Sequence, residues 1–526
     1  MQVTGAFRVV GGWHTRLTAP NRLFTAFPLQ GPARCATLEP YPPRAGDNKR
    51  EECKMNGFVK SCALALAACL LAGCAPSLPP QPTLDELLAE VNAEHQAVHQ
   101  PRVDESQYLR EAPDEESVAR FTEGEWTDFD PDAEVTAAQA AEDVEYLFDA
   151  FRTLYGPYDY FGGDETFGEH KAELLAKLEE KESWTATEVQ NLLVGELGFL
   201  KDGHFNINGV RTNLFQVPFF FREVAFYKIE EGDYISEKGK RVASVDGYSD
   251  LDELFKRSIS PEGQLVYYPV LLKELARTSQ QKVCDETLTV RYADGSAQTL
   301  TAEPFQRYNR ENEGNSITEY YKDGEIPVFV LNRCDTAANN EIEAGAIIVA
   351  RYPVGMVDLR TNPGGSDSVS RLWLGRYTGA SDKVFKNQYM MNVFTSSGLS
   401  GGADDDWVEN DDRVLIVLTG TRIASAAETF VDMSHSVENV LIIGENTAGM
   451  QVASAAYSIQ LPNSRCFVTM GDGLFTVPQD WDYYKEFRGY EPDLWVPADE
   501  AEELAVKLME NLGAVQAEGE AASLAA

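Results

Sequence analysis

The sequence predicts an α/β protein built from several parts, and three patterns support this fold class. In the last third of the chain, apolar runs such as RVLIVLT (413–419) and VLIIG (440–444) alternate with helical stretches. Before residue 204, apolar residues recur at helical spacing in several segments. Residues 205–310 show short alternating runs separated by turn signals. The 526 residues suffice for two or three domains.

Residues 55–73 have the composition of a secretory signal. Lys60 precedes an apolar stretch from 61 to 73, which is too short to span a bilayer as a stable helix. The stretch ends in Leu71-Ala72-Gly73-Cys74, which resembles the lipobox of bacterial lipoproteins, whose cysteine takes a diacylglycerol. A buried core helix is the alternative, but the Pro-rich segment PSLPPQP follows at once. We therefore expect a lipid anchor at Cys74 in a bacterial cell envelope, with the protein facing outside the cytoplasm.

Residues 1–54 differ in charge from the rest of the chain. They contain eight Lys or Arg against four Asp or Glu, whereas the whole chain has a net charge of −39. A signal so far inside a chain is unusual, so we interpret Met55 as the translation start and 1–54 as a mis-called upstream stretch. The acidic remainder repels nucleic acid and anionic lipid head groups, so we expect no nucleic-acid partner.

The cysteines that remain after the signal are few and scattered. They are Cys74, Cys284, Cys334 and Cys466, and their spacing fits neither a disulfide framework nor a zinc pattern. The sequence leaves open whether two of the last three form a disulfide. We expect no metal and no cofactor.

Residues 74–133 are rich in Pro, Asp and Glu, and we interpret them as an acidic stalk. His95 and His99 within it could in principle bind a metal, but a solvated helix face explains them better because no third ligand is near. Residues 134–204 form a predicted helical subdomain, with clear periodicity in 136–155, that ends at Lys201-Asp202-Gly203-His204.

The remaining two thirds divide into a β-rich part and an α/β part. Residues 205–310 predict a strand, a turn and a helix around 235–259, and then a hairpin around 286–301. Residues 311–512 predict a mostly buried sheet with helices, which places active-site loops at the C-terminal ends of strands. Residues 513–526 predict a disordered tail.

Ser425 stands where the apolar run 413–419 gives way to a helix, in GTRIASAAETF (420–430). With Glu428 it fits a capping box, in which hydroxyl and carboxylate each satisfy a backbone N–H of the first turn. The other interpretation is a nucleophile, because a strand-to-helix junction exposes its side chain and directs free N–H groups at an oxyanion. This stretch alone does not decide between them.

Two more glycine-marked loops follow apolar runs. In GMVDLRTNPGGSDS (355–368), Gly364 and Gly365 could turn their N–H groups toward an oxyanion, or could form an ordinary Pro-Gly turn. GENTAGM (444–450) by itself indicates only a loop.

Taken together, four ordered motifs resemble the tail-specific and tricorn family of serine proteases. They are DLRTNPGG, IASAAE, GENTAG and, at 489–496, GYEPDLWV, and the resemblance spans roughly 136–510. It implies an α/β catalytic domain of the crotonase/ClpP type with Ser425 as nucleophile. It also implies an oxyanion hole from Gly364 or Gly365 and the N–H of Ala426.

The resemblance also indicates the general base. Tail-specific members have a lysine just after the GENTAG element, but this chain has Met450, which cannot take a proton. Tricorn-type members use a histidine from a D-x-H element, and Asp202-Gly203-His204 occupies that place. His204 is then the base, since a neutral imidazole can accept the serine proton. A loop histidine with a structural hydrogen bond is the alternative.

The third relay member and the β-rich part are less well matched. Glu486 stands where tricorn-type members have a histidine-orienting glutamate, but Phe487 replaces the usual asparagine, and a surface glutamate is the alternative. Gly203 stands where some members have a supporting serine. Residues 205–310 occupy the place of a PDZ domain without a recognisable carboxylate-binding loop, so we interpret them as a diverged PDZ-like domain. Specificity for free C-termini does not follow.

The resulting hypothesis is a membrane-anchored extracytoplasmic serine peptidase that acts on peptides or proteins. A non-catalytic peptide- or ligand-binding lipoprotein that retains the fold is the main alternative, motivated by the missing lysine. A hydrolase of non-peptide esters is a third. The sequence does not indicate the oligomeric state.

Overall fold

The computed structural model describes residues 78–98, 105–229, 232–310, 314, 316–321, 324–381, 385, 390–394, 407–454, 457–475 and 482–515. The predicted upstream stretch 1–54, the signal 55–73, Cys74, His99 and residues 516–526 lie outside these ranges. Within these ranges, none of the helices has the length and apolar composition needed to cross a membrane.

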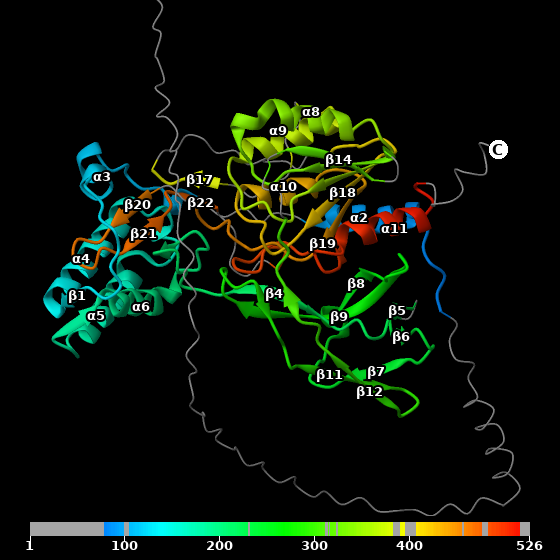
Figure 1. Cartoon of the computed structure of the whole chain (residues 1–526), viewed down its shortest axis with the longest axis horizontal. Coiled ribbons are helices and arrows are strands. Elements are labelled where there is room, and N and C mark those ends of the chain that lie inside the picture. The colour runs from blue at the N-terminus through cyan, green and yellow to red at the C-terminus, as the bar shows by residue number, and fades with distance from the viewer. Residues whose placement is uncertain are drawn as a thin grey trace, which may run out of the picture. The chain divides into compact units, whose positions relative to one another are not determined.

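A six-stranded sheet forms the centre of the α/β part, in the order β14-β15-β16-β18-β19-β23 (Figure 1). Its strands are β14 (Ile317–Tyr321), β15 (Ile326–Val330), β16 (Val354–Asp358), β18 (Val414–Thr419), β19 (Val440–Gly444) and β23 (Leu494–Trp495). β14 runs antiparallel to β15, and all other neighbours are parallel. The C-terminal ends of β16, β18 and β19 therefore lie at one edge, where the three predicted motif loops begin.

Helices cover both faces of this sheet, which explains why its strands are apolar throughout. On β18, Leu415 and Val417 face the core shared with α8, α9 and α10, whereas Ile416 and Leu418 face the core shared with α2 and α11. The helices are α2 (Leu84–Ala97), α8 (Asn339–Val349), α9 (Asp367–Thr378), α10 (Ala426–Ser434) and α11 (Ala501–Asn511). The predicted α/β fold class is confirmed.

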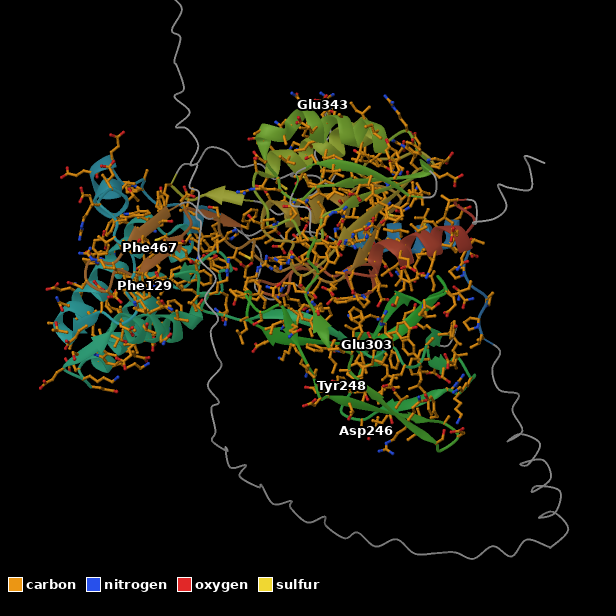
Figure 2. All side chains as sticks on the ribbon, viewed as in Figure 1. Phe129, Asp246, Tyr248, Glu303, Glu343 and Phe467 are labelled. Carbon is orange, nitrogen blue, oxygen red and sulfur yellow. The ribbon has the colours of Figure 1, made fainter. Side chains whose placement is uncertain are left out.

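The helical subdomain contains strands from the far end of the chain. Its helices are α3 (Glu115–Thr122), α4 (Ala137–Leu154), α5 (Gly163–Leu178) and α6 (Ala186–Glu196), with short 3-10 turns at 105–108, 156–158 and 197–199 and the paired strands β1 (Glu134–Thr136) and β2 (Ser183–Thr185). Beside them, β3 (Asn206–Ile207) pairs with β21 (Phe467–Met470), and β21 with β20 (Tyr457–Gln460). Figure 2 shows Phe467 of β21 and Phe129 in this same part of the molecule. The subdomain thus extends beyond the predicted 134–204.

The β-rich part consists of two main sheets. One has the order β4-β9-β5-β6 with β8 added to β9, and the other has the order β12-β11-β7. The elements are β4 (Phe215–Phe220), β5 (Phe226–Lys228), β6 (Tyr234–Ser236), β7 (Val242–Val245), α7 (Leu251–Leu254), β8 (Phe255–Ile259), β9 (Leu265–Leu275), β10 (Gln281–Lys282), β11 (Thr287–Tyr292), β12 (Ala297–Thr301) and β13 (Phe305–Gln306). The predicted hairpin around 286–301 is β11–β12. A further pair, β17 (Met390–Asn392) and β22 (Gly473–Phe475), links two loops.

The structure differs from the predicted stalk between 74 and 133. Leu87, Leu88 and Val91 of α2 are buried in the core on one face of the central sheet. His95 is also buried, and its Nε2 lies 2.9 Å from Asp493 Oδ1. An acidic helix whose apolar stripe packs on a sheet is part of the body and cannot serve as a spacer.

The three described cysteines after the signal, Cys284, Cys334 and Cys466, are free. The disulfide that the sequence left open therefore does not form among them.

Candidate active site

Ser425 lies at a strained junction between β18 and α10. Its backbone has φ 55° and ψ −130°, a region that residues with a Cβ rarely occupy. The glutamate half of the predicted capping box forms, because Ser425 N–H donates to Glu428 Oε2 over 3.1 Å. Glu428 N–H donates to the Ser425 backbone carbonyl over 2.7 Å. The other capping boxes, at Thr83, Thr136 and Thr185, keep the usual extended backbone. Capping alone therefore does not account for the conformation of Ser425, and a strained strand-to-helix turn of this kind is one that could present a nucleophile.

Glu428 fixes this turn to the GENTAG loop. Besides Ser425 N–H, its carboxylate accepts hydrogen bonds from Thr447 Oγ1 (2.6 Å), Gly449 N (2.8 Å) and Met450 N (2.8 Å). Burial raises the pKa of Glu428, and these four donors oppose that rise. The capping glutamate is thus the point at which two of the predicted motifs meet.

The Gly364-Gly365 loop lies against Ser425. A Cβ on Gly364 would come within 2.8 Å of Ser425 Cβ and 3.2 Å of Ala426 N, and Gly364 has φ +109°. Its N–H is not free, because it donates to Asn362 Oδ1 over 2.9 Å. In the described part of the chain, the N–H groups of Gly365 and Ala426 have no hydrogen-bond partner. Of the predicted oxyanion donors, Gly365 and Ala426 are the available pair, and Gly364 provides the close approach.

His204 lies on a short loop before β3 and is almost fully buried. Its N–H donates to Asp202 Oδ1 over 2.8 Å, while its Nδ1 has no hydrogen-bond partner. Burial lowers the pKa of His204 to about 4, helped by the charges of Arg211 and Arg277. The imidazole is therefore neutral near pH 7, as a proton acceptor must be.

Glu486 does not contact the imidazole, although the sequence predicted that it might orient it. Its carboxylate accepts hydrogen bonds from Gly203 N (2.7 Å), Gln451 N (3.0 Å), Val452 N (3.0 Å) and the Tyr484 hydroxyl (2.6 Å). Glu486 is half-buried, and both of its carboxylate oxygens accept hydrogen bonds. Burial, with the charge of nearby Asp202, raises its pKa to about 8. Glu486 contacts the His204 loop through the N–H of the preceding residue, Gly203.

Asp202 is a buried carboxylate that also contacts the Gly203-His204 segment. Tyr155 Oη donates to its Oδ2 over 2.9 Å, and burial raises the pKa of Asp202 to about 6. Asp202 and Glu486 therefore hold the Gly203 and His204 N–H groups from two sides. This pairing depends on residues far apart in the sequence, and the sequence analysis missed the roles of Asp202 and Tyr155.

Met450 joins the two halves of the site. A Cβ on Gly203 would lie 2.6 Å from Met450 Cγ, so the thioether packs against the histidine loop. Met450 N–H in turn donates to Glu428, which holds Ser425. The structure thus brings the loops of Ser425, His204 and Glu486 into one connected set of contacts. Among the described residues, however, no hydrogen bond joins the Ser425 hydroxyl, the His204 ring and the Glu486 carboxylate.

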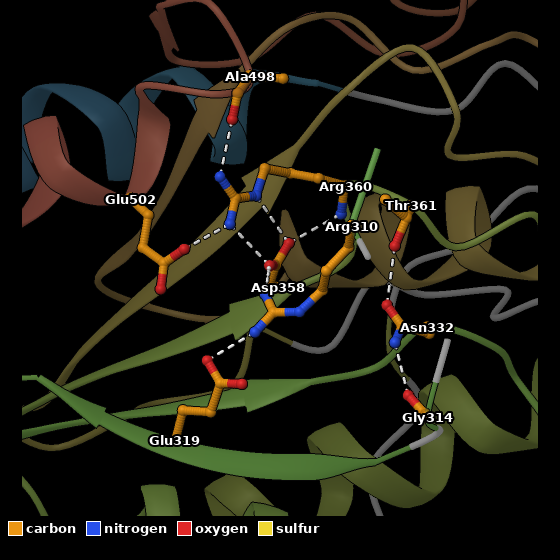
Figure 3. A network of polar contacts seen from close by, with 9 residues as sticks. All are labelled: Arg310, Gly314, Glu319, Asn332, Asp358, Arg360, Thr361, Ala498 and Glu502. Carbon is orange, nitrogen blue, oxygen red and sulfur yellow. Dashed lines mark hydrogen bonds and ion pairs between the residues drawn. The ribbon is translucent and has the colours of Figure 1, made fainter. Parts of the chain in front are cut away.

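The DLR element, residues 358–360, supports the Gly364-Gly365 loop that follows it. Figure 3 shows Asp358, at the end of β16, between Arg310 and Arg360, with Glu319 and Glu502 beyond them. Arg360 Nε and Nη2 donate to the two Asp358 oxygens over 2.9 and 2.7 Å. Burial alone would raise the pKa of Asp358, but these guanidinium groups hold it below its ordinary value. The network ties the loop to α11 and to β14.

One cluster of potential metal ligands is present in the described ranges, and it lies between α5 and α6. Atoms of His170, Glu173 and Glu196 come within 4.8 Å of one another. Glu196 also forms an ion pair with Lys177, which supplies the positive charge that a metal ion would bring. None of these residues contacts the loops around Ser425 described above.

Residues 351–494 match the family model described as Peptidase family S41. This match supports an S41-type protease. The matched region contains Gly365, Ser425 and Glu486, whereas His204 precedes it. The predicted resemblance to tail-specific proteases is confirmed at the level of this family.

The chain is also similar, at low identity, to solved structures. Mature CPAF is 13% identical, with a TM-score of 0.38 over 72% of this chain and 99% of the other. A photosystem II D1 C-terminal processing protease is 14% identical, with a TM-score of 0.31 over 68% of this chain and 93% of the other. The tricorn protease is 15% identical, with a TM-score of 0.35 over 72% of this chain and 37% of the other. No curated protein sequence matches the chain.

The sequence analysis also missed two arginines near these loops. Arg211 Nε donates to Gly203 O over 2.6 Å, and Arg277 Nη2 donates to Arg422 O over 2.7 Å. Both therefore hold backbone next to the predicted catalytic residues. No spacing in the sequence marks them, because their partners are main-chain carbonyls of distant loops.

Proposed function

We propose that the protein is a serine peptidase in which Ser425 is the nucleophile and His204 the general base. One observation supports this most strongly: a serine in a strained backbone conformation stands beside two unpaired N–H groups, on Gly365 and Ala426. Such strain is retained where function needs a side chain and an oxyanion site in fixed register. The substrates proposed are peptides or proteins, in keeping with family S41.

The proposed reaction proceeds through an acyl-enzyme. Ser425 Oγ attacks the carbonyl carbon of the scissile bond while His204 takes the hydroxyl proton. The oxyanion accepts hydrogen bonds from Gly365 and Ala426 N–H. The C–N bond then breaks, and His204 returns the proton to the leaving amine. Water attacks the ester in a second round of the same steps and releases the acid and free Ser425.

Glu486 and Asp202 are proposed as positioning residues. Each accepts a backbone N–H from the Gly203-His204 segment, at 2.7 and 2.8 Å. They place the imidazole by holding its main chain, and substrate binding must bring the ring and the Ser425 hydroxyl into hydrogen-bond reach, since catalytic hydrogen bonds often tighten only in the complex.

We also propose that the protein is anchored to a bacterial cell envelope through a lipid on Cys74 and faces outside the cytoplasm. The signal-like residues 55–73 and the lipobox-like end support this. Labelled palmitate should enter the wild type and fail to enter Cys74→Ser. Equal labelling of both proteins would contradict the anchor.

A non-catalytic binding protein is the second candidate, and one observation favours it. Among the described residues, His204 Nδ1 is buried without a hydrogen-bond partner, and no carboxylate forms a hydrogen bond with the ring. Met450 occupies the place of a lysine base. A retained fold could then bind peptides without cleaving them.

The experiment combines a fluorophosphonate probe with a diverse peptide library. We expect labelling at Ser425 and cleavage by the wild type, with both lost in Ser425→Ala and cleavage reduced at least 100-fold in His204→Ala. His170→Ala is the matched control, because that imidazole belongs to the helical subdomain and bonds Glu196. Absence of labelling in folded protein would favour the binder. Full activity of His204→Ala would place the base elsewhere, and ester turnover without peptide cleavage would indicate an esterase.

A further inference from the structure

The guanidinium groups of Arg211 and Arg277 lie beside the loops of His204 and Ser425. We call these two residues the arginine pair. Arg211, on the loop after β3, holds Gly203 O, and Arg277, just after β9, holds the carbonyls of Thr421 and Arg422. Their Cζ atoms lie 5.8 and 5.5 Å from the centroid of the same Phe215 ring. Both guanidinium groups therefore lie near one ring and hold the backbone of the loops that carry His204 and Ser425.

No carboxylate of the described residues lies within ion-pair distance of this pair, although the charges of Asp202 and Glu428 act on Arg211 and Arg277 from further away. Within the described residues, neither Arg211 nor Arg277 forms an ion pair, and the Nη atoms of Arg211 donate no hydrogen bond. Behind them, Arg307 is only 3% exposed, and its Nη2 has no partner. Burial, together with the charges of Arg307 and Arg211, lowers the pKa of Arg277 to about 9. Buried cations normally have a carboxylate partner. The arginine pair lacks such a partner within the described residues, although the chain has a net charge of −39.

The arginine pair also disfavours the protonated form of His204, which the proposed catalysis requires. When His204 takes the Ser425 proton, the resulting imidazolium stands near two positive charges that already lower its pKa. The other charged groups at this loop are Asp202, on its own side, and Glu486, which packs from the C-terminal part. Neither bonds the ring. A neutral substrate leaves this imbalance in place, whereas a substrate carboxylate between the guanidiniums removes it.

We propose that Arg211 and Arg277 form a subsite for an acidic side chain of the substrate, next to the scissile bond, and that filling it completes the catalytic site. This inference rests on the proposed peptidase function. Guanidinium groups bind carboxylates through paired charge-assisted hydrogen bonds, for which the free Nη atoms of Arg211 are available. The bound anion then stabilises the imidazolium as well as the complex, so the acidic substrate gains in kcat and in KM.

The test uses peptide pairs that differ only by Glu or Gln, at each position flanking the cleaved bond, each with a free and an amidated C-terminus. At one position we expect at least a tenfold higher kcat/KM for the Glu peptide, in both C-terminal forms. Arg211→Gln and Arg277→Gln should reduce this ratio to near one. Arg291→Gln is the matched control, since that exposed arginine pairs with Asp246 in the β-rich part.

The pH profile provides a readout that a merely structural role would not change. In the wild type, the acid limb of kcat should lie at higher pH for the Glu peptide than for the Gln peptide, because kcat reports ionisation in the enzyme–substrate complex, where the bound carboxylate favours the protonated imidazole. This separation should disappear in Arg277→Gln. Fluorophosphonate labelling of that variant shows whether the Ser425 turn is intact, and Arg211→Gln, at a half-buried site, carries the test if Arg277→Gln does not fold.

A binding arm separates failure of this inference from failure of the proposed function. In Ser425→Ala, Glu peptides should bind at least tenfold more tightly than Gln peptides, and Arg277→Gln added to that variant should abolish the difference. Equal binding and equal kcat/KM for both members would overturn the subsite. A preference that requires a free C-terminus, with no effect of the side chain, would overturn it as well. Absence of Ser425-dependent cleavage with a retained binding preference would contradict only the peptidase function.

Discussion

Glycine at position 364 is needed for two separate reasons, its backbone conformation and its closeness to the nucleophile. It has φ +109°, and a Cβ there would lie 2.7 Å from Ala424 O and 2.8 Å from Ser425 Cβ. Gly379 has a similar φ of +77° with no atom within 4 Å of its Cβ position. A comparison of alanine substitutions at these two glycines therefore distinguishes the effect of backbone strain from the effect of displacing Ser425.

We predict that Gly364→Ala lowers kcat/KM at least 100-fold, because the added methyl displaces the turn that carries Ser425. Gly379→Ala should cost only about 1 kcal/mol of stability from its positive φ and leave kcat/KM within about twofold. Peptide turnover and urea unfolding measure both effects. Similar losses of activity in the two variants would contradict the steric explanation.

His204 makes the stability of the protein depend on pH. Its pKa in the folded state is about 4, below the ordinary value of about 6.5 in the unfolded chain. Between these values the unfolded chain binds the proton that the folded protein excludes. The free energy of unfolding therefore falls as pH falls through this window, by about 3 kcal/mol for this group.

His204→Gln removes this contribution, because glutamine does not titrate. We predict that the difference in free energy of unfolding between wild type and variant changes by about 3 kcal/mol from pH 7 to pH 4, in favour of the variant. Chemical denaturation across that range measures it. A constant difference would show that the imidazole is protonated or solvated in the folded state.

Sequence reasoning finds residues whose chemistry is local and misses those whose partners are distant. Ser425 and the two loop glycines stand in short ordered motifs beside strand ends, so their neighbourhood could be predicted. Gly203 and Glu486 meet only because chain segments 283 residues apart fold together. The same holds for the arginine pair. Its partners are backbone carbonyls, which every residue type has, so the sequence does not mark them.

Helix α2 shows how composition can conceal packing at the scale of an element. Its acidic residues suggested a solvated stalk, but Leu87, Leu88, Val91 and His95 form one buried stripe against the central sheet. The reverse occurs at 344–352, where an apolar run that resembles a strand belongs largely to α8 (Asn339–Val349). Similarly, the predicted helix in 251–259 is a single turn followed by β8. Short apolar runs do not distinguish buried helices from strands.

We predict that Leu87→Ala lowers the free energy of unfolding by about 2–5 kcal/mol, because it opens a cavity between α2 and the sheet. Gln96→Ala, at an exposed position of the same helix, should change it by no more than about 0.5 kcal/mol. Equal and small effects of both substitutions would indicate that α2 is a free stalk.

At the scale of the whole molecule, the layered α/β centre could be predicted, but the boundaries of its neighbours could not. The apolar strands and their interleaved helices determine the sheet through local pattern. The helical subdomain, in contrast, is completed by β20 and β21, which lie beyond the nucleophile in the chain and pair with β3. No periodicity near residue 204 indicates that its supporting strands come from residues 457–470.

Because β20 and β21 come late in the chain, the helical subdomain is completed late in synthesis. As the chain emerges from the ribosome or an export channel, Ser425 appears before the strands that flank β3 and steady the loop just ahead of it. Until those strands arrive, the His204 loop lacks the strand β21 that pairs with β3. Under the proposed peptidase function, the nascent protein therefore carries Ser425 without a completed catalytic centre and becomes competent to cleave its neighbours only after residues 457–470 have folded.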